Sequence, residues 1–158
     1  MKTQNKLEKM LSKQVVLGDG AMGTMLYESG IFLNTCFDEL NLVKSKLIKR
    51  VHDKYIQAGV DFIETNTFGA NEFKLGKFGL ADKVEAINRA AVEIAKECGG
   101  EDVLVAGSMG PLGREFSRFG RLSEKEFGTA FEKQAKVLIE AGVDFLILET
   151  FSDRKSVV

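Results

Sequence analysis

The sequence predicts an α/β protein with a parallel sheet, either doubly wound or closed into a (β/α) barrel. Short apolar runs alternate strictly with longer segments of helical spacing, which is the pattern of such folds. The stretch AGVDFIETNTFG at 58–69 also returns as AGVDFLILETFS at 141–152, two strand-helix units later. A repeat of this period favours the barrel, because alternate strands of a barrel contribute side chains to the same interior layers.

Four short runs of apolar, largely β-branched residues predict buried strands. They cover residues 15–17, 60–63, 103–106 and 143–148. With 158 residues the chain can bury a sizeable core, and we expect one domain over residues 1–158.

Between these strands, three segments carry apolar residues at steps of three and four positions, which is typical of amphipathic helices. Ser123 with Glu126, and Asp82 with Glu85, predict capping boxes at the starts of two of the helices. The apolar stripes are Leu47, Ile48, Val51 and Tyr55; Val84, Ile87, Ala91, Ile94 and Cys98; and Phe127, Phe131, Ala135 and Leu138.

The repeated stretch also indicates where a binding site lies. Aligning its two copies pairs Phe62 with Phe145 and Asn66 with Glu149. The polar residue comes last in both copies, and in parallel α/β proteins the carboxyl ends of the strands carry the site. We therefore expect Asn66 and Glu149 at the mouth of a site. The alternative is that each residue caps the following helix or turn.

A glycine-rich loop, GDGAMGT at 18–24, follows the first predicted strand. It matches G-x-G-x-x-G, but the next predicted strand comes too late for a dinucleotide-binding unit, so nicotinamide or flavin binding is the weaker interpretation. Accessible backbone N–H groups suit a carboxylate or a phosphate, and Asp19 adds a fixed anion beside them. An α-amino acid would match this loop together with Asp19 and Glu149. A second glycine loop, at 107–114, either shapes a wall of the site or only connects two elements.

The composition argues against nucleic-acid and membrane partners. The formal net charge is −1, so no basic excess is available to hold a phosphate backbone. No segment approaches the roughly 20 apolar residues of a membrane span, and the N-terminus lacks the apolar run of a signal peptide. Two cysteines are too few for a disulfide framework, so we expect a cytoplasmic protein.

Six stretches cover nearly the whole chain in order: VVLGDGAMGTMLY, CFDELN, AGVDFIETNTFGAN, LGKFGL, GSMGPLG and LILETFSD. Together they resemble the N-terminal half of the homocysteine-binding domain of the homocysteine S-methyltransferase family. The likeness is greatest to the bacterial form that precedes a methylenetetrahydrofolate reductase module. Cobalamin-dependent methionine synthase and the betaine enzyme are more distant. The resemblance implies the first half, about four βα units, of a TIM-type (β/α)8 barrel.

The resemblance also implies an activity and a site. The activity is transfer of a methyl group to the thiol of homocysteine to give methionine, from a donor of the methyltetrahydrofolate, methylcobalamin or S-methylmethionine type. Asp19 and Glu149 match residues that hold the substrate ammonium, and the backbone around Gly23 and Thr24 matches the loop that receives the carboxylate. The substrate-binding residues that the resemblance implies are Asp19, Gly20, Ala21, Gly23, Thr24, Thr65, Asn66, Thr67 and Glu149.

The zinc ion that activates the thiol in this family has no matching ligands in the sequence. Three thiolates hold the metal in the family, one after a later strand and two in a GGCCGT motif, and none is present here. Cys98 lies on a core-facing stripe, Cys36 matches a position that is not a ligand, and His52 lies mid-helix, so they do not make a zinc site. A free thiol is only a few per cent thiolate at neutral pH, so we expect the isolated chain to be inactive.

The fourth predicted strand and the start of its helix are the last residues of the sequence. Four strands cannot close an eight-stranded barrel, and the outer strands would keep open edges. We therefore expect a truncated chain that pairs with the other half of the barrel or with itself, and that is oligomeric or aggregation-prone alone. Two other functions stay open: a non-catalytic amino-acid-binding or assembly half-barrel, and a nicotinamide or flavin enzyme.

Overall fold

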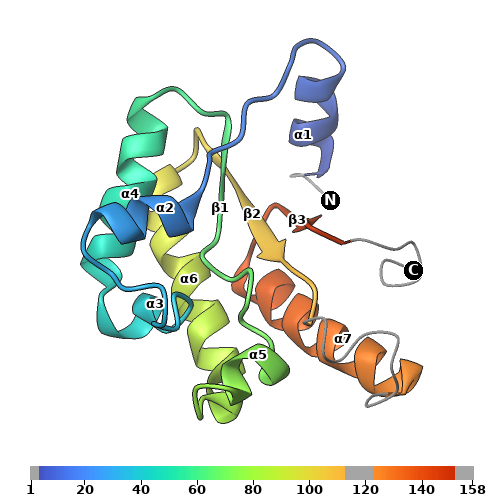
Figure 1. Ribbon diagram of the computed structural model, residues 1–158. Helices are drawn as coiled ribbons and strands as arrows, with labels where there is room; N and C mark the ends of the chain where they lie inside the picture. The colour runs from blue at the N-terminus through green and yellow to red at the C-terminus, as the bar shows by residue number, and fades with distance from the viewer. Residues whose placement is uncertain (1–3, 113–122, 152–158) are drawn as a thin grey trace.

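The computed structural model describes residues 4–112 and 123–151 and shows a mixed α/β fold around a small parallel sheet (Figure 1). Glu64 on the first strand pairs with Ala106 on the second, and Ala106 pairs with Phe145 on the third. Because the strands run in the same direction, their carboxyl ends meet at one edge of the sheet. In the described residues the strands, in sheet order, are β1 (Phe62–Glu64), β2 (Leu104–Met109) and β3 (Phe145–Leu148).

Three of the predicted strands are confirmed with shifted boundaries, and the first is not. Residues 15–17 form no strand, and this part of the chain meets β1 through one isolated parallel bridge between Gly18 and Phe62. The Leu17 carbonyl accepts a hydrogen bond from the Asp61 N–H at 2.7 Å. Leu17 is nevertheless 54% exposed. The segment therefore runs beside β1 on one side, but one bridge does not make a ladder.

Three long helices pack against the sheet. α4 (Ser45–Gln57) contacts β1, α6 (Val84–Gly99) contacts β1 and β2, and α7 (Glu124–Ala141) contacts β2. Each contains one of the predicted apolar stripes, and no described helix is long and apolar enough to cross a membrane. The shorter helices are α1 (Gln4–Leu11), α2 (Met22–Glu28), α3 (Leu40–Val43), α5 (Glu72–Gly76) and the 3-10 helix η1 (Ala81–Lys83).

The predicted capping box of α7 is confirmed, and that of α6 is wrong. The Glu126 N–H donates to Ser123 Oγ at 3.3 Å, and the Ser123 N–H donates to Glu126 Oε2 at 2.7 Å. In contrast, α6 begins after Lys83 without any side-chain cap. Asp82 does not reach the start of α6 because it lies inside η1, which precedes that helix.

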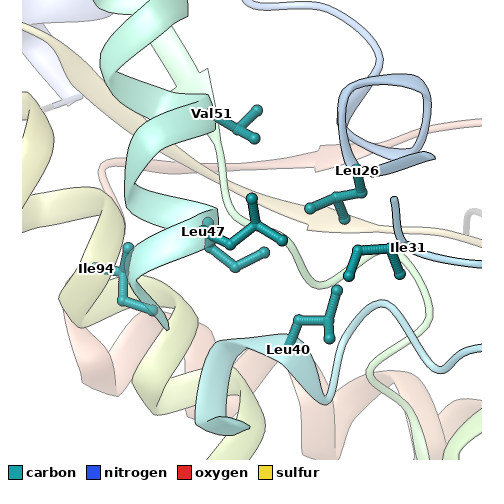
Figure 2. Packing of buried hydrophobic residues seen from close by; sticks show 7 residues of the cluster. Leu26, Ile31, Leu40, Leu47, Val51 and Ile94 are labelled. Carbon is teal, nitrogen blue, oxygen red and sulfur yellow. The ribbon is translucent and has the colours of Figure 1, made fainter. Parts of the chain in front are cut away.

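The core lies between the helices and the sheet and continues past the sheet among the helices. Ile63 of β1 and Val105 of β2 are fully buried and pack with Val60 and with Ala95 of α6. A second cluster joins α2, α3, α4 and α6. Figure 2 shows its side chains converging from Leu26, Ile31, Leu40, Leu47, Val51 and Ile94.

The opposite face of the sheet carries the aromatic residues of the repeat. Side chains alternate along a strand, so Phe62 points away from the side where its neighbour Ile63 packs with α6. Phe62 and Phe145 meet edge to face, with ring centroids 5.4 Å apart. The aligned aromatic residues of the two copies therefore lie on one face of the sheet.

Candidate functional site

A cavity of about 760 Å³ opens at the carboxyl ends of the strands. Its walls come from the loop after the first predicted strand, from the 33–38 segment, from the chain between the end of β1 and α5, and from the ends of β2 and β3. The predicted substrate-binding residues that line it are Asp19, Gly20, Ala21, Gly23, Thr65, Asn66, Thr67 and Glu149. Thr24 is exposed on α2 and is not among the residues lining the cavity.

Asp19 is fixed by the main chain of β1. The Glu64 N–H lies 3.1 Å from both carboxylate oxygens of Asp19, and the Asp19 N–H donates to the Phe62 carbonyl at 3.2 Å. The preceding residue must be small, because a Cβ on Gly18 would lie 2.4 Å from the Phe62 ring. Burial raises the pKa of Asp19 to about 6, and the negative charge of Glu149 adds to the rise.

Glu149 enters the cavity directly after β3. Its N–H donates to the Met109 carbonyl at 3.1 Å, and its Oε1 accepts a hydrogen bond from the Ser108 hydroxyl. The next residue, Thr150, has a φ of 62° and is the non-glycine residue with positive φ in the described chain. A β-branched residue rarely adopts this left-handed conformation. Both the bond to Ser108 and the turn at Thr150 therefore constrain the direction of the Glu149 side chain.

Glu64 is a third carboxylate of the cavity, which the sequence reasoning did not select as a site residue. Its pKa is raised to about 7, first by burial and then by the charges of Glu149 and Asp19. Side chains alternate along a strand, so Glu64 lies on the same face of β1 as Phe62. The sequence could not show that Asp19 and Glu149 would lie beside Glu64.

The hydroxyls of Thr65 and Thr67 hold the ends of β1 and β2 together. Their Oγ1 atoms are 2.6 Å apart, Thr67 Oγ1 donates to the Ser108 carbonyl at 2.7 Å, and the Ser108 N–H donates to Thr65 Oγ1 at 3.1 Å. Both threonines are buried. Although both threonines line the cavity, their hydroxyls bond to each other and to the main chain of Ser108. These bonds hold Ser108 in place, and the Ser108 hydroxyl donates to Glu149.

The Asn66 side chain fastens the strand end to the 37–41 segment. Its Nδ2 donates to the Phe37 carbonyl at 2.7 Å and to Asn41 Oδ1 at 3.2 Å, while Asn41 Nδ2 donates to the Asn66 carbonyl at 2.8 Å. Neither bond of the Asn66 amide goes to a helix cap. Asn66 and Glu149, which the repeat aligns, therefore both line the cavity but form hydrogen bonds to different partners.

The loop around Gly20 leads into α2, whose first residues face the cavity. Ala21 is the N-cap, has extended backbone and offers no side-chain acceptor. The first N–H groups of a helix have no acceptor within that helix. A Cβ on Gly20 would come within 3.1 Å of the Tyr55 hydroxyl, and one on Gly23 within 3.3 Å of the Phe37 ring. The residues from Gly20 to Gly23 line the cavity, so the start of α2 contributes to its wall.

Cationic and further acidic groups, not predicted from the sequence, line the cavity near α5. The Lys74 ammonium lies 4.1 Å from the centroid of the Phe68 ring. Asp38 Oδ1 accepts a hydrogen bond from the Gly69 N–H at 2.9 Å, and burial raises the pKa of Asp38 to about 6. The stretches FDELN and TFGANEFK contain these residues, but only the fold brings Asp38 and Lys74 to the same wall.

The residues that the structure describes do not fit a zinc ion. In the described chain no three His, Cys, Asp or Glu side chains are arranged to hold a metal. Cys36 packs in a core cluster with Leu75 and Ile87. Cys98 is partly buried on α6, and burial raises its pKa to about 12, which disfavours the thiolate that binds metals. His52 is fully buried on α4.

A family comparison decides what kind of protein carries this cavity. Residues 16–157 match the model of the family described as homocysteine S-methyltransferase. The chain belongs to the homocysteine S-methyltransferase family. The resemblance seen in the six sequence stretches is therefore confirmed.

Two methionine synthases and a solved homocysteine methyltransferase structure are similar to this chain. Methionine synthase of Mycobacterium tuberculosis is 33% identical over 156 residues, and that of Mycobacterium leprae is 31% identical over 159 residues. These matches cover 91% and 93% of this chain but 13% of each relative. The metallated crystal form of the homocysteine methyltransferase MmuM from Escherichia coli is similar with a TM-score of 0.82 and 28% identity. That match covers 96% of this chain and 59% of MmuM.

Proposed function

We propose that the cavity binds homocysteine by its amino-acid end and forms the substrate side of a homocysteine S-methyltransferase. The observation that carries the proposal is that Asp19, Glu64 and Glu149 line one cavity although they come from three separate parts of the chain. An ammonium group among these carboxylates would make charge-assisted hydrogen bonds, which are roughly twice as strong as neutral ones. Family membership makes homocysteine the α-amino acid to test first.

The carboxylate of the same ligand would be received near the start of α2. Ala21 leaves the first N–H groups of the helix without a side-chain acceptor, and Gly20 and Gly23 keep the backbone accessible from the cavity. Such N–H groups favour an anion. Homocysteine would then lie with its two charged groups on the protein and its thiol directed toward the methyl donor.

The chemical step is methylation of sulfur. A bond forms between the homocysteine sulfur and the methyl carbon, the bond between that carbon and the donor breaks, and the thiol proton is lost. The thiolate is the reactive form of the sulfur. Because the described residues do not fit the zinc ion of the family, the part proposed for this chain is to bind and orient the amino-acid end. The donor type stays a prediction.

We further propose that the sheet belongs to a TIM-type (β/α)8 barrel. The support is the parallel order of β1, β2 and β3, the helices packed against them, and the similarity in fold to MmuM. Pairing with a further half of the barrel, a reductase module downstream and a cytoplasmic location all stay predictions.

Calorimetric titration of the chain with homocysteine tests the proposed site. Replacing the carboxylate in Glu149→Gln, or in Asp19→Asn, should weaken binding at least about tenfold, because a hydrogen bond to a charged group contributes roughly 1.5–3 kcal/mol. Both substitutions keep the size of the side chain, which limits damage to the fold.

Glu93→Gln is the matched control, since Glu93 is exposed on α6 and lies outside the cavity. It should leave the affinity for homocysteine unchanged. Binding of nicotinamide or flavin dinucleotides in place of homocysteine would favour the alternative interpretation of the glycine loop. Unchanged affinity in both Glu149→Gln and Asp19→Asn would contradict the proposed site.

A further inference from the structure

The cavity that contains the three carboxylates is also lined by a cation, Lys74. Lys74 of α5 is half-buried, and its ammonium lies over the Phe68 ring at 4.1 Å from the centroid. The ion pairs within 4.0 Å in the described chain do not include Lys74. Removing a cation from water is costly unless a counter-charge compensates. The charge of Asp38 compensates in part, and an anion that enters the cavity would add a direct partner.

The Lys74 side chain is held in place rather than free to move into solvent. The main-chain N–H of Lys74 donates to Asn71 Oδ1 at 3.0 Å, which fixes the first turn of α5. Lys74 Cδ lies 3.3 Å, and Asp38 Oδ2 2.7 Å, from the position that a Cβ on Gly69 would take, so the lysine stem and the carboxylate both pack over this glycine. Burial lowers the pKa of Lys74, and the positive charge of Lys77 adds to this shift, while the charges of Asp38 and, more weakly, Glu149 oppose it.

We infer that Lys74 binds the carboxylate of the amino-acid ligand and makes the cavity selective for a zwitterion over a simple amine. This inference rests on the proposed function. Asp19, Glu64 and Glu149 attract an ammonium, but a ligand with only an ammonium would bring no negative group to Lys74. A ligand with both charges matches both the carboxylates and the cation that line the cavity.

The test compares homocysteine with its carboxamide, which keeps the ammonium and thiol but lacks the negative charge. Lys74→Met keeps the stem over Gly69 and Phe68 and removes the charge, whereas Lys74→Arg keeps the charge. The unaltered chain should bind homocysteine about tenfold more tightly than the carboxamide, as a charge-assisted contact provides. Lys74→Met should lose this preference by binding homocysteine more weakly with unchanged affinity for the carboxamide. Lys74→Arg should retain it.

Lys46→Met, a substitution of an exposed lysine on α4, is the control and should behave like the unaltered chain. Equal loss of both ligands in Lys74→Met would assign Lys74 a packing role only, and unchanged binding of both would assign it none. Either result overturns the inference while leaving the proposed function intact. A folded, unaltered chain that binds neither ligand, with folding checked by circular dichroism, overturns the proposed function and the inference with it.

Discussion

At the scale of single residues, His52 carries the clearest energetic cost. It is fully buried on α4, and neither ring nitrogen has a hydrogen-bond partner in the described chain. Burial lowers its pKa from 6.5 to about 4. Because the folded pKa lies below the unfolded value, the unfolded state binds more protons between these two values. The stability of the fold should therefore fall as the pH drops from 6.5 toward 4.

Replacing His52 with Leu should raise the stability at neutral pH and weaken its dependence on acid. At one pKa unit per roughly 1.4 kcal/mol, the acid-dependent part amounts to about 3 kcal/mol. At pH 7 the gain should be on the order of 1 kcal/mol, since an unpaired buried polar group is removed. Urea unfolding at pH 7 and pH 4.5 measures both effects. An unaltered difference between the two pH values in His52→Leu would contradict this account.

Thr150 is a second residue that costs stability, and its place beside Glu149 links that cost to the site. Left-handed backbone costs a non-glycine residue roughly 1–2 kcal/mol. Thr150→Gly should therefore raise the unfolding free energy by about 1 kcal/mol. It should also weaken homocysteine binding, because a less constrained turn no longer directs the Glu149 carboxylate. Urea unfolding and calorimetry on the same variant test this, and a change of both quantities in the same direction would count against it.

At the scale of elements, α7 holds the chain that follows β1 in place through a hydrogen bond. Gln134 Nε2 on this helix donates to the Thr67 carbonyl at 2.8 Å, next to the hydroxyls that join β1 to β2.

Ser123→Ala removes the N-cap of α7 and should lower the unfolding free energy by about 1 kcal/mol. Asp82→Ala is the comparison: Asp82 does not cap α6, so its removal should change stability by less than about 0.5 kcal/mol. Equal losses in the two variants would refute the assigned caps.

The same two positions show how far sequence reasoning reaches for the elements. Ser123 and Asp82 carry the same local pattern, yet only Ser123 begins a long helix, because Asp82 lies inside the 3-10 helix that precedes α6. The segment at 15–17 has the composition of a strand but lies beside β1 at a single bridge. Periodicity reports which residues suit burial. Periodicity does not show which segment a predicted strand or helix will pack against or pair with.

At the scale of the whole molecule, the site depends on three chain segments that bring carboxylates together. Asp19 and Glu149 were predicted from the glycine loop and the repeat, since each follows a predicted strand. Glu64 and Lys74 were not, because their importance arises from neighbours distant in sequence. Local patterns therefore located the edge of the sheet that forms the cavity, while the charge balance of the cavity required the fold.

This clustering predicts a pH dependence of binding. The pKa of Asp19 is about 6 and that of Glu64 about 7, so both carboxyls gain negative charge as the pH rises from 5 to 7.5. Even a chain-terminal α-amino group, with a pKa of roughly 7.7–8.0, is more than half protonated at pH 7.5, and the α-amino group of a free amino acid is more basic. Affinity for homocysteine should therefore increase over this range, and Glu64→Gln should flatten the increase. Calorimetry at several pH values measures it, and affinity that is constant or declines in the unaltered chain would exclude this arrangement.

Two aromatic rings near the cavity occupy the places of absent side chains. A Cβ at Gly18 would lie 2.4 Å from the Phe62 ring, and one at Gly110 would lie 2.3 Å from the Phe68 ring. Each ring and its glycine are thus packed so closely that enlarging the glycine requires a smaller residue at the ring position. Libraries that randomise the cavity to alter substrate choice should vary each pair jointly, because single replacements at either glycine will be lost before their effect on recognition can be observed.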